Sequence, residues 1–81
     1  MRLVERPLTV ASSSAGRPQS FSWRGKSHIV RTIPESWADT GAWWEGEPEK
    51  IFYRLLVDDG GLYELYQERI SGRWYLYKVY D

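Results

Sequence analysis

The chain lacks cysteine entirely and has a single histidine, His28, among its 81 residues. Without thiols there is no disulfide framework, no thiolate zinc site and no cysteine nucleophile. One histidine plus carboxylates is a poor ligand set, and the "EGEPE" run at 45–49 is typical of a solvated charge run rather than of a metal site. We therefore expect no metal and no cofactor, and a fold stabilised by packing alone.

Long apolar runs are also missing. No segment approaches the roughly 20 apolar residues that a membrane-spanning helix requires. The N-terminal "MRLVERPLTV" carries a proline and three charges where a secretory signal would need an apolar stretch. These features predict a cytoplasmic protein.

Excess charge of either sign is absent, because 11 basic residues balance 11 acidic ones. The charges are unevenly placed: residues 1–33 hold six cations, whereas residues 34–68 hold nine carboxylates. Domains that bind duplex nucleic acid usually show a clear basic excess, since neutralised phosphates dominate their affinity. Only a local basic patch is possible here.

Aromatic residues, by contrast, are abundant: five Trp, six Tyr and two Phe. From residue 50 on they fill the β-like runs "IFYRLLV", "LYELY" and "WYLYKVY", which are separated by Asp- and Gly-rich gaps typical of hairpins. Both alternating faces of "IFYRLLV" are largely apolar, which favours a small, strongly bent barrel over an open sheet with one wet face. In "WYLYKVY" the inward face is ambiguous, because Trp74 and Leu76 share a face with Lys78 while Val79 lies on the other, and a β-bulge could reconcile them.

The N-terminal half predicts a short strand at "RPLTV", an exposed flexible loop at 11–20 and a tight hairpin near Gly25. Pro34 and Pro48 bracket a Trp-rich segment without sustained periodicity, in which "PESWAD" could form one helical turn. We therefore expect one domain, 1–81, with an all-β fold. Its architecture would be a five- or six-stranded antiparallel barrel-like sheet with one long Trp-rich loop or helical turn at about 34–49.

Catalytic motifs are lacking. His28 lies in a predicted strand with no nucleophile motif near it, so we interpret it as a structural residue. Gly60 and Gly61 follow two aspartates instead of opening a helix, which argues against a phosphate-cradling loop. We expect no catalytic residues and no enzymatic activity.

The sequence offers two kinds of candidate binding surface, the first of which suits a protein partner. Trp43 and Trp44 would point to opposite sides of an extended chain, so one could anchor the loop to the core while the other docks on a partner. Their glutamate neighbours repel phosphate and suit a protein surface. Arg54 lies among apolar residues and either pairs with a buried carboxylate such as Glu64 or faces a ligand.

The second kind is a nucleic-acid surface. Aromatics interleaved with Arg and Lys in "FSWRGK" and "GRWYLYK" could stack single-stranded bases, as small barrels with exposed rings do. The residues that would serve this role are Trp23, Arg24, Lys26, Arg31 and Trp74. The alternative is that most of these rings form the core.

Several stretches together resemble a small bacterial family of unknown function. They are "FSWRGKSHIV", "ESWADTGAWWEGE", "IFYRLLVDDGGLYELYQE" and "GRWYLYKVYD", which cover nearly the whole chain. This family's domain is similar to the C-terminal tail of catalytically inactive Y-family polymerase homologues of bacterial mutagenic repair. His28 departs from the family's pattern, which usually has an aromatic residue there.

The resemblance implies a role associated with DNA-damage tolerance, and it implies no catalytic residues. It implies partner contacts for the polymerase-associated tail rather than nucleotide chemistry. We therefore expect a non-catalytic interaction module that binds another protein, associated with DNA repair or translesion synthesis. The alternative is a small β-barrel that binds single-stranded nucleic acid.

Overall fold

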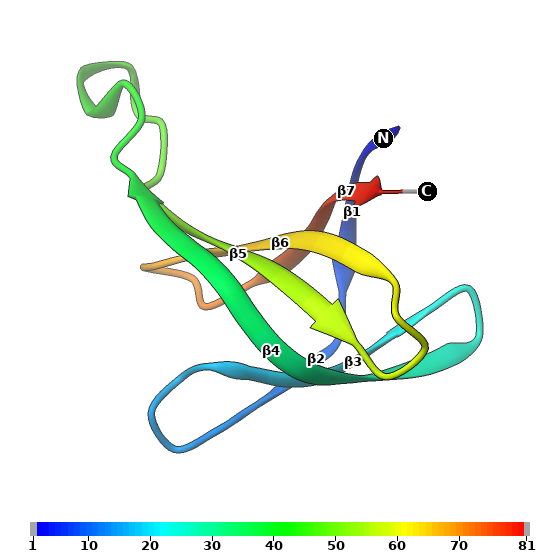
Figure 1. Ribbon diagram of the computed structural model, residues 1–81. Helices are drawn as coiled ribbons and strands as arrows, with labels where there is room; N and C mark the ends of the chain where they lie inside the picture. The colour runs from blue at the N-terminus through cyan, green and yellow to red at the C-terminus, as the bar shows by residue number, and fades with distance from the viewer. Residues whose placement is uncertain (1, 81) are drawn as a thin grey trace.

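The protein is described by a computed structural model that covers residues 2–80, apart from the side chain of Trp43. Its elements are seven strands and one short 3₁₀ turn (Figure 1), namely β1 (Arg2–Leu8), β2 (Val10–Ser12), β3 (Pro18–Trp23), β4 (Lys26–Asp39), η1 (Trp43–Glu45), β5 (Lys50–Val57), β6 (Leu62–Glu68) and β7 (Trp74–Tyr80). The strands pair antiparallel in the order β1-β7-β6-β5-β4-β3-β2. No described segment forms a helix with the length and apolarity needed to cross a membrane.

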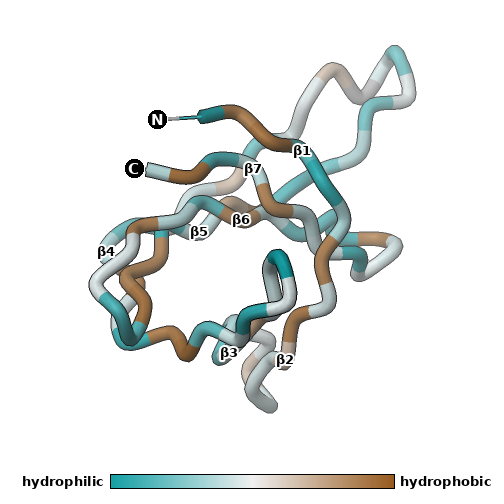
Figure 2. The backbone as a smooth tube through the Cα atoms, turned by 90° about the vertical axis from the view of Figure 1, so that its right-hand side faces the viewer, coloured by the Kyte–Doolittle hydropathy of each residue, from teal (hydrophilic) through white to brown (hydrophobic). Residues whose placement is uncertain are grey.

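The sheet curls on itself because β4 is long enough to belong to two sets of pairs. Residues 26–29 of β4 pair with β3, and the remainder pairs with β5. The two edge strands, β1 and β2, are separated in the chain by Thr9 alone, and β1 also touches β3. Figure 2 looks along the resulting curl. The predicted all-β, barrel-like fold is confirmed, with seven strands instead of five or six.

The core lies inside the curl. Leu55, Val57, Leu65 and Leu76 are fully excluded from solvent and come from the three strands β5, β6 and β7. Phe21, Tyr53, Trp74 and Val79 complete the buried cluster. In β5 the core residues alternate with Phe52 and Arg54, which places those two side chains on the outer face of the sheet.

A β-bulge in β7 brings its apolar residues inward. Leu65 pairs with Leu76, but the preceding Glu64 pairs with Lys78, which leaves Tyr77 as an extra residue. Leu76 and Val79 can then both be buried although three positions separate them. The bulge considered for "WYLYKVY" is present and settles which of its residues face inward.

The hairpin predicted near Gly25 is also confirmed. Trp23 pairs with Lys26, so Arg24 and Gly25 form a two-residue turn. Their φ angles are 52° and 75°, the left-handed conformation that this type of turn requires at both positions. Glycine meets that requirement without strain, whereas Arg24 adopts it against its preference.

The helical turn expected at "PESWAD" is wrong, since β4 continues to Asp39. Glu35 to Asp39 pair residue by residue with β5, and this pairing outweighs the weak local helical signal. Pro34 falls where the register shifts, so its missing N–H interrupts no regular ladder. The irregular segment is thus 40–49, with η1 inside it. Likewise β2 and β3 occupy both ends of the expected 11–20 loop, which leaves 13–17 as the connection.

Candidate functional site

Four aromatic side chains form a continuous row across the outer face of the sheet. In the strand register Trp37 of β4 pairs with Phe52 of β5, Phe52 with Tyr66 of β6, and Tyr66 with Tyr75 of β7. Successive ring centroids are 5.5, 5.2 and 4.9 Å apart, and the first and last pairs are stacked. We call these four residues the aromatic row. Directly opposed rings of this kind stabilise a sheet and also present a broad apolar surface.

Further rings and cations extend the aromatic row. The bulge residue Tyr77 packs edge-on against Phe52, with centroids 5.1 Å apart. The ammonium of Lys50 lies 4.8 Å from the ring centre of Tyr66, and that of Lys78 lies 5.0 Å from that of Tyr77. Such cations over ring faces are attracted by the ring quadrupole and leave room for a ligand beside them.

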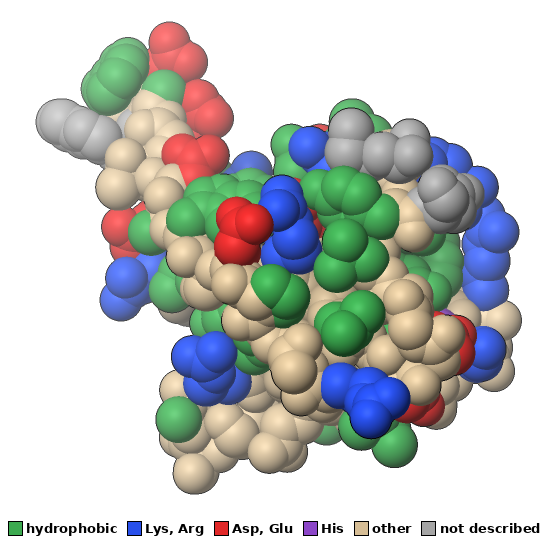
Figure 3. Space-filling view, in the orientation of Figure 1, with side chains coloured by type: hydrophobic (Ala, Val, Ile, Leu, Met, Phe, Trp, Pro, Cys, Tyr) green, Lys and Arg blue, Asp and Glu red, His purple; other side chains and the backbone are tan. Residues whose placement is uncertain are grey.

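The aromatic row lies on the outer face of the sheet, opposite the buried core cluster. Among residues 2–80, the elements that make extensive contacts are neighbours in the sheet, together with β1 and β3. Trp37 at the end of the row is 36% exposed, while Phe52 and Tyr66 are shielded by the rings around them. Figure 3 shows hydrophobic side chains gathered around charged ones over β4, β5 and β6.

A charged row runs beside the aromatic row. Glu35, Arg54 and Glu64 are register partners on β4, β5 and β6. Arg54 donates to Glu64 over 3.2 and 3.3 Å and to Glu35 over 2.7 Å. Glu64 is only 2% exposed and also accepts a hydrogen bond from the Tyr80 hydroxyl. Of the two roles considered for Arg54, pairing with the buried Glu64 is the one seen.

These contacts shift the pKa values of two partners. Burial alone would lower the pKa of Arg54, but its hydrogen bond to Glu64 and the nearby negative groups outweigh that, and the pKa is raised. The hydrogen bond to Glu64 raises the pKa of Tyr80, and burial adds to the effect. Arg54 therefore remains charged and Tyr80 remains protonated at neutral pH.

The Trp-rich segment 40–49 joins β4 to β5 and extends away from the sheet (Figure 1). Its base is fixed by the Gly41 N–H, which donates to the Asp39 carboxylate over 2.8 Å, and by an ion pair between Glu49 and Arg69 at 3.1 Å. Trp44 is 69% exposed. The side chain of Trp43 lies outside the described residues, so the predicted division of the pair into core anchor and docking residue stays a prediction for Trp43.

Of the basic residues predicted to act with Trp23, Arg24 and Lys26 lie beside it, and Arg2 and Arg6, which were not predicted, join them. Arg2, Arg6 and Arg24 line a hollow of about 490 Å³ beside Trp23. The guanidinium of Arg24 lies 5.5 Å from the ring centre of Trp23. Lys26 lies at the margin of a second, smaller hollow, where its ammonium is paired with Asp59 at 3.0 Å.

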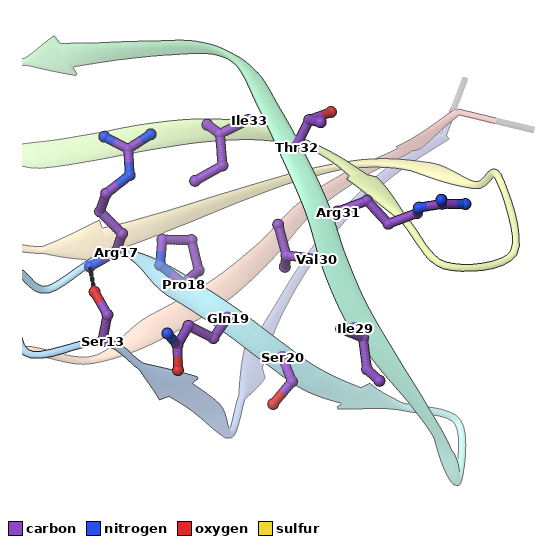
Figure 4. A pocket seen from close by; sticks show the side chains of 10 residues that line it. All are labelled: Ser13, Arg17, Pro18, Gln19, Ser20, Ile29, Val30, Arg31, Thr32 and Ile33. Atoms are coloured by element: carbon purple, nitrogen blue, oxygen red, sulfur yellow. Dashed lines mark hydrogen bonds between the residues drawn. The ribbon is translucent and has the colours of Figure 1, made fainter.

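Arg31 and Trp74 do not join this group. Arg31 lines a separate hollow of about 690 Å³ between β3 and β4 (Figure 4). Its guanidinium and that of Arg17 point away from each other there, so no charged groups converge. Trp74 is buried in the core and packs on Tyr53, with ring centroids 5.5 Å apart, so it is not available to stack a base.

The aromatic row was not anticipated from the sequence. Its four residues lie on four strands, and only the strand register reveals that they are opposite one another. The available signal was the apolar character of both faces of "IFYRLLV", which indicated that rings would occur outside the core as well as inside it.

The fold and its outer face define a small all-β domain with an aromatic surface and no recognisable catalytic constellation among residues 2–80. The chain belongs to a family of domains of unknown function (DUF6504), which it matches over residues 2–81. This confirms the family resemblance inferred from the motifs.

Curated relatives include Protein ImuB of Caulobacter vibrioides, from strain NA1000 / CB15N and from strain ATCC 19089 / CIP 103742 / CB 15. Each is 28% identical to this chain over 98 aligned residues, which cover 99% of this chain and 21% of the relative. The chain thus spans about a fifth of the length of these relatives. No solved structure matches it.

Proposed function

We propose that the domain is a non-catalytic interaction module that binds a protein partner through its outer face. The observation that carries the proposal is the aromatic row, an unbroken series of rings from β4 to β7 whose two middle rings are buried and whose end rings, Trp37 and Tyr75, reach the surface. Trp37 is 36% exposed at one end of the row, and Trp, Tyr and Arg dominate binding energies at protein interfaces.

The carboxylates beside the aromatic row favour a protein over a nucleic acid, although Lys50 and Lys78 place two cations over its rings. Arg54 is already neutralised by Glu35 and Glu64, so it offers little attraction to phosphate. The adjoining 40–49 segment adds Glu45 and Glu47 beside the exposed Trp44. The partner that fits is an apolar or aromatic protein segment flanked by basic residues.

The similarity to Protein ImuB supports a place for this module in mutagenic DNA repair. The family resemblance connects the domain with the tail of inactive polymerase homologues, where it would contribute contacts and no chemistry. We propose the same role here, with the partner belonging to the damage-tolerance machinery.

Site-specific photo-crosslinking in living cells tests the proposal. A benzophenone amino acid replaces Trp37 or Trp44 in two variants, and Ile29, which is exposed on another part of the sheet, in a control. We expect irradiation to attach the same protein at positions 37 and 44 and not at 29. Attachment at position 29 alone, or at none of the three after DNA damage, would rule out the outer face as the docking surface.

A second candidate function is binding of single-stranded nucleic acid, favoured by the hollow that Arg2, Arg6 and Arg24 form around Trp23. Guanidinium groups beside an accessible ring suit phosphate contacts and base stacking. A labelled single-stranded oligonucleotide titrated at low and moderate salt distinguishes the two functions. Salt-sensitive binding that is weakened by Arg24→Ala and unaffected by Trp37→Ala would support this second function.

A further inference from the structure

Two turns at one end of the curled sheet bring three potential metal ligands together. The β3–β4 turn is followed by His28, and the β5–β6 turn carries Asp58 and Asp59. One ligand atom from each of these three residues lies within 4.8 Å of the other two. The backbone fixes the arrangement, because the Asp58 N–H donates to the Ile29 carbonyl over 2.9 Å.

The imidazole of His28 is buried and has one nitrogen without a hydrogen-bond partner. The residue is 3% exposed, and its ring stacks on Phe21 with centroids 5.2 Å apart. Nε2 lies within 3.5 Å of the Tyr63 hydroxyl, whereas Nδ1 has no hydrogen-bond partner among the described residues and lies 3.8 Å from the Asp59 carboxylate. Buried polar nitrogens are nearly always satisfied, so an orphaned Nδ1 that faces a carboxylate calls for a ligand.

The Asp59 carboxylate is already oriented toward the same point. Its Oδ1 accepts the Gly61 N–H over 2.9 Å, which leaves Oδ2 facing both His28 and the ammonium of Lys26. The Lys26 side chain is 64% exposed, and exposed ion pairs of this kind contribute little free energy. The Lys26 ammonium thus occupies the place of a cation beside Asp59, and a more strongly bound metal ion can displace it.

We propose that His28, Asp58 and Asp59 bind a divalent transition-metal ion such as Zn²⁺, with His28 Nδ1 and one oxygen of each aspartate as ligands. Imidazole with carboxylates is a ligand set that zinc accepts. The Tyr63 hydroxyl beside Nε2 would hold the ring in the required tautomer. The proposal is independent of the docking function of the outer face.

The charges of the surroundings explain why both aspartates are needed. Arg2, Arg24 and Lys26 line the hollow that opens on this cluster, and their positive charge opposes a bare cation. Two carboxylates and a neutral imidazole neutralise a divalent ion completely. The loss of either aspartate leaves a net positive centre among cations.

The test is a zinc titration of the untagged chain, followed through the imidazole signals of His28 by NMR. Since His28 is the sole histidine, its ring signals report on this site alone. We expect saturable one-to-one binding that shifts the ring signals and the amides of residues 58–61. Asp58→Asn, at an exposed position, should weaken the affinity by about ten-fold or more.

Lys26→Ala provides the decisive comparison, because removing a competing cation should tighten zinc binding, whereas a surface lysine with no relation to the site should have no effect. Glu47→Gln, at an exposed acidic position in the 40–49 segment, serves as the matched control and should leave the affinity unchanged. Zinc that shifts only residues 45–49 and leaves the His28 ring unmoved would overturn the proposal. So would a Lys26→Ala variant that binds zinc no more tightly than the parent chain.

Discussion

Arg54 connects the ionic and the aromatic parts of the outer face. Besides its bonds to Glu35 and Glu64, its guanidinium lies 5.7 Å from the ring centre of Trp37 and 5.5 Å from that of Tyr80. A planar guanidinium can donate in its plane and stack on rings above it, which an ammonium cannot do. Arg54 therefore holds Trp37 in place and is itself held by Glu64.

Glu64→Gln should destabilise the fold more than Glu35→Gln, although both remove a charge from the same arginine. Glu64 is buried and accepts from Arg54 and Tyr80, whereas Glu35 is exposed and paired with Arg54 alone. The Glu64 substitution removes the buried charge that both Arg54 and Tyr80 contact, whereas an exposed pair such as Glu35–Arg54 contributes little. Thermal unfolding followed by circular dichroism measures the difference. Equal melting temperatures for the two variants would contradict the structural role of Glu64.

The raised pKa of Tyr80 predicts that the folded domain loses stability at alkaline pH. Its hydrogen bond to Glu64, together with burial, raises its pKa above the ordinary value of 10.0, so folding favours the protonated phenol. The corresponding stabilisation is fully present below pH 10 and is lost as the pH rises through the folded-state pKa. Urea unfolding midpoints from pH 8 upward should therefore fall more steeply for the parent chain than for Tyr80→Phe. If the urea midpoints of the two proteins fall in parallel with pH, the Tyr80 hydroxyl does not contribute to stability in this way.

At the scale of elements, local signals predicted some features and missed others. The Arg24–Gly25 turn and the bulge at Tyr77 were predictable, because turn chemistry and alternation are local properties. The extension of β4 through Glu35 to Asp39 was not, since it depends on pairing with β5. The aromatic row was missed for the same reason, whereas the Arg54–Glu64 pair was one of two roles that an isolated charge in an apolar run suggested.

The bulge in β7 predicts opposite outcomes for two deletions. Removing Tyr77 should restore regular alternation and keep Trp74, Leu76 and Val79 inside, at the cost of the contacts of one ring. Removing Tyr75 should force either Trp74 or Leu76 out of the core. Urea denaturation monitored by tryptophan fluorescence should show a cooperative transition for the first variant and none for the second. Two equally cooperative transitions would show that the register is not fixed by this bulge.

The whole molecule divides its side chains between two layers. The inner layer contains the aliphatic core from β5, β6 and β7, and the outer layer contains the aromatic row and the charged row. Small domains bury a modest fraction of their surface, so most of the stability must come from the inner layer. Of the outer rings, Trp37 and Tyr75 at the ends of the row reach the surface, whereas Phe52 and Tyr66 are buried.

Substitutions in the two layers should separate stability from binding. Leu65→Ala opens a cavity in the fully buried core and should cost about 2–5 kcal/mol of unfolding free energy. Trp37→Ala, at the exposed end of the aromatic row, should cost clearly less. Chemical denaturation measures the loss of unfolding free energy in both variants. A larger loss for Trp37→Ala than for Leu65→Ala would mean that the outer face is primarily structural.

The central claim is that the outer aromatic face is the docking surface. Its most direct test is the affinity of the protein captured by crosslinking at positions 37 and 44, measured by isothermal titration calorimetry against three purified forms of the domain. These are the parent chain, the folded Trp37→Ala/Tyr75→Ala variant, and Arg6→Ala/Arg24→Ala as a control in the basic hollow. The account predicts that the outer-face variant loses about 30-fold or more in affinity, equivalent to about 2 kcal/mol, and that the control binds as the parent does. Unchanged affinity for the outer-face variant, or a loss confined to the control, would contradict it.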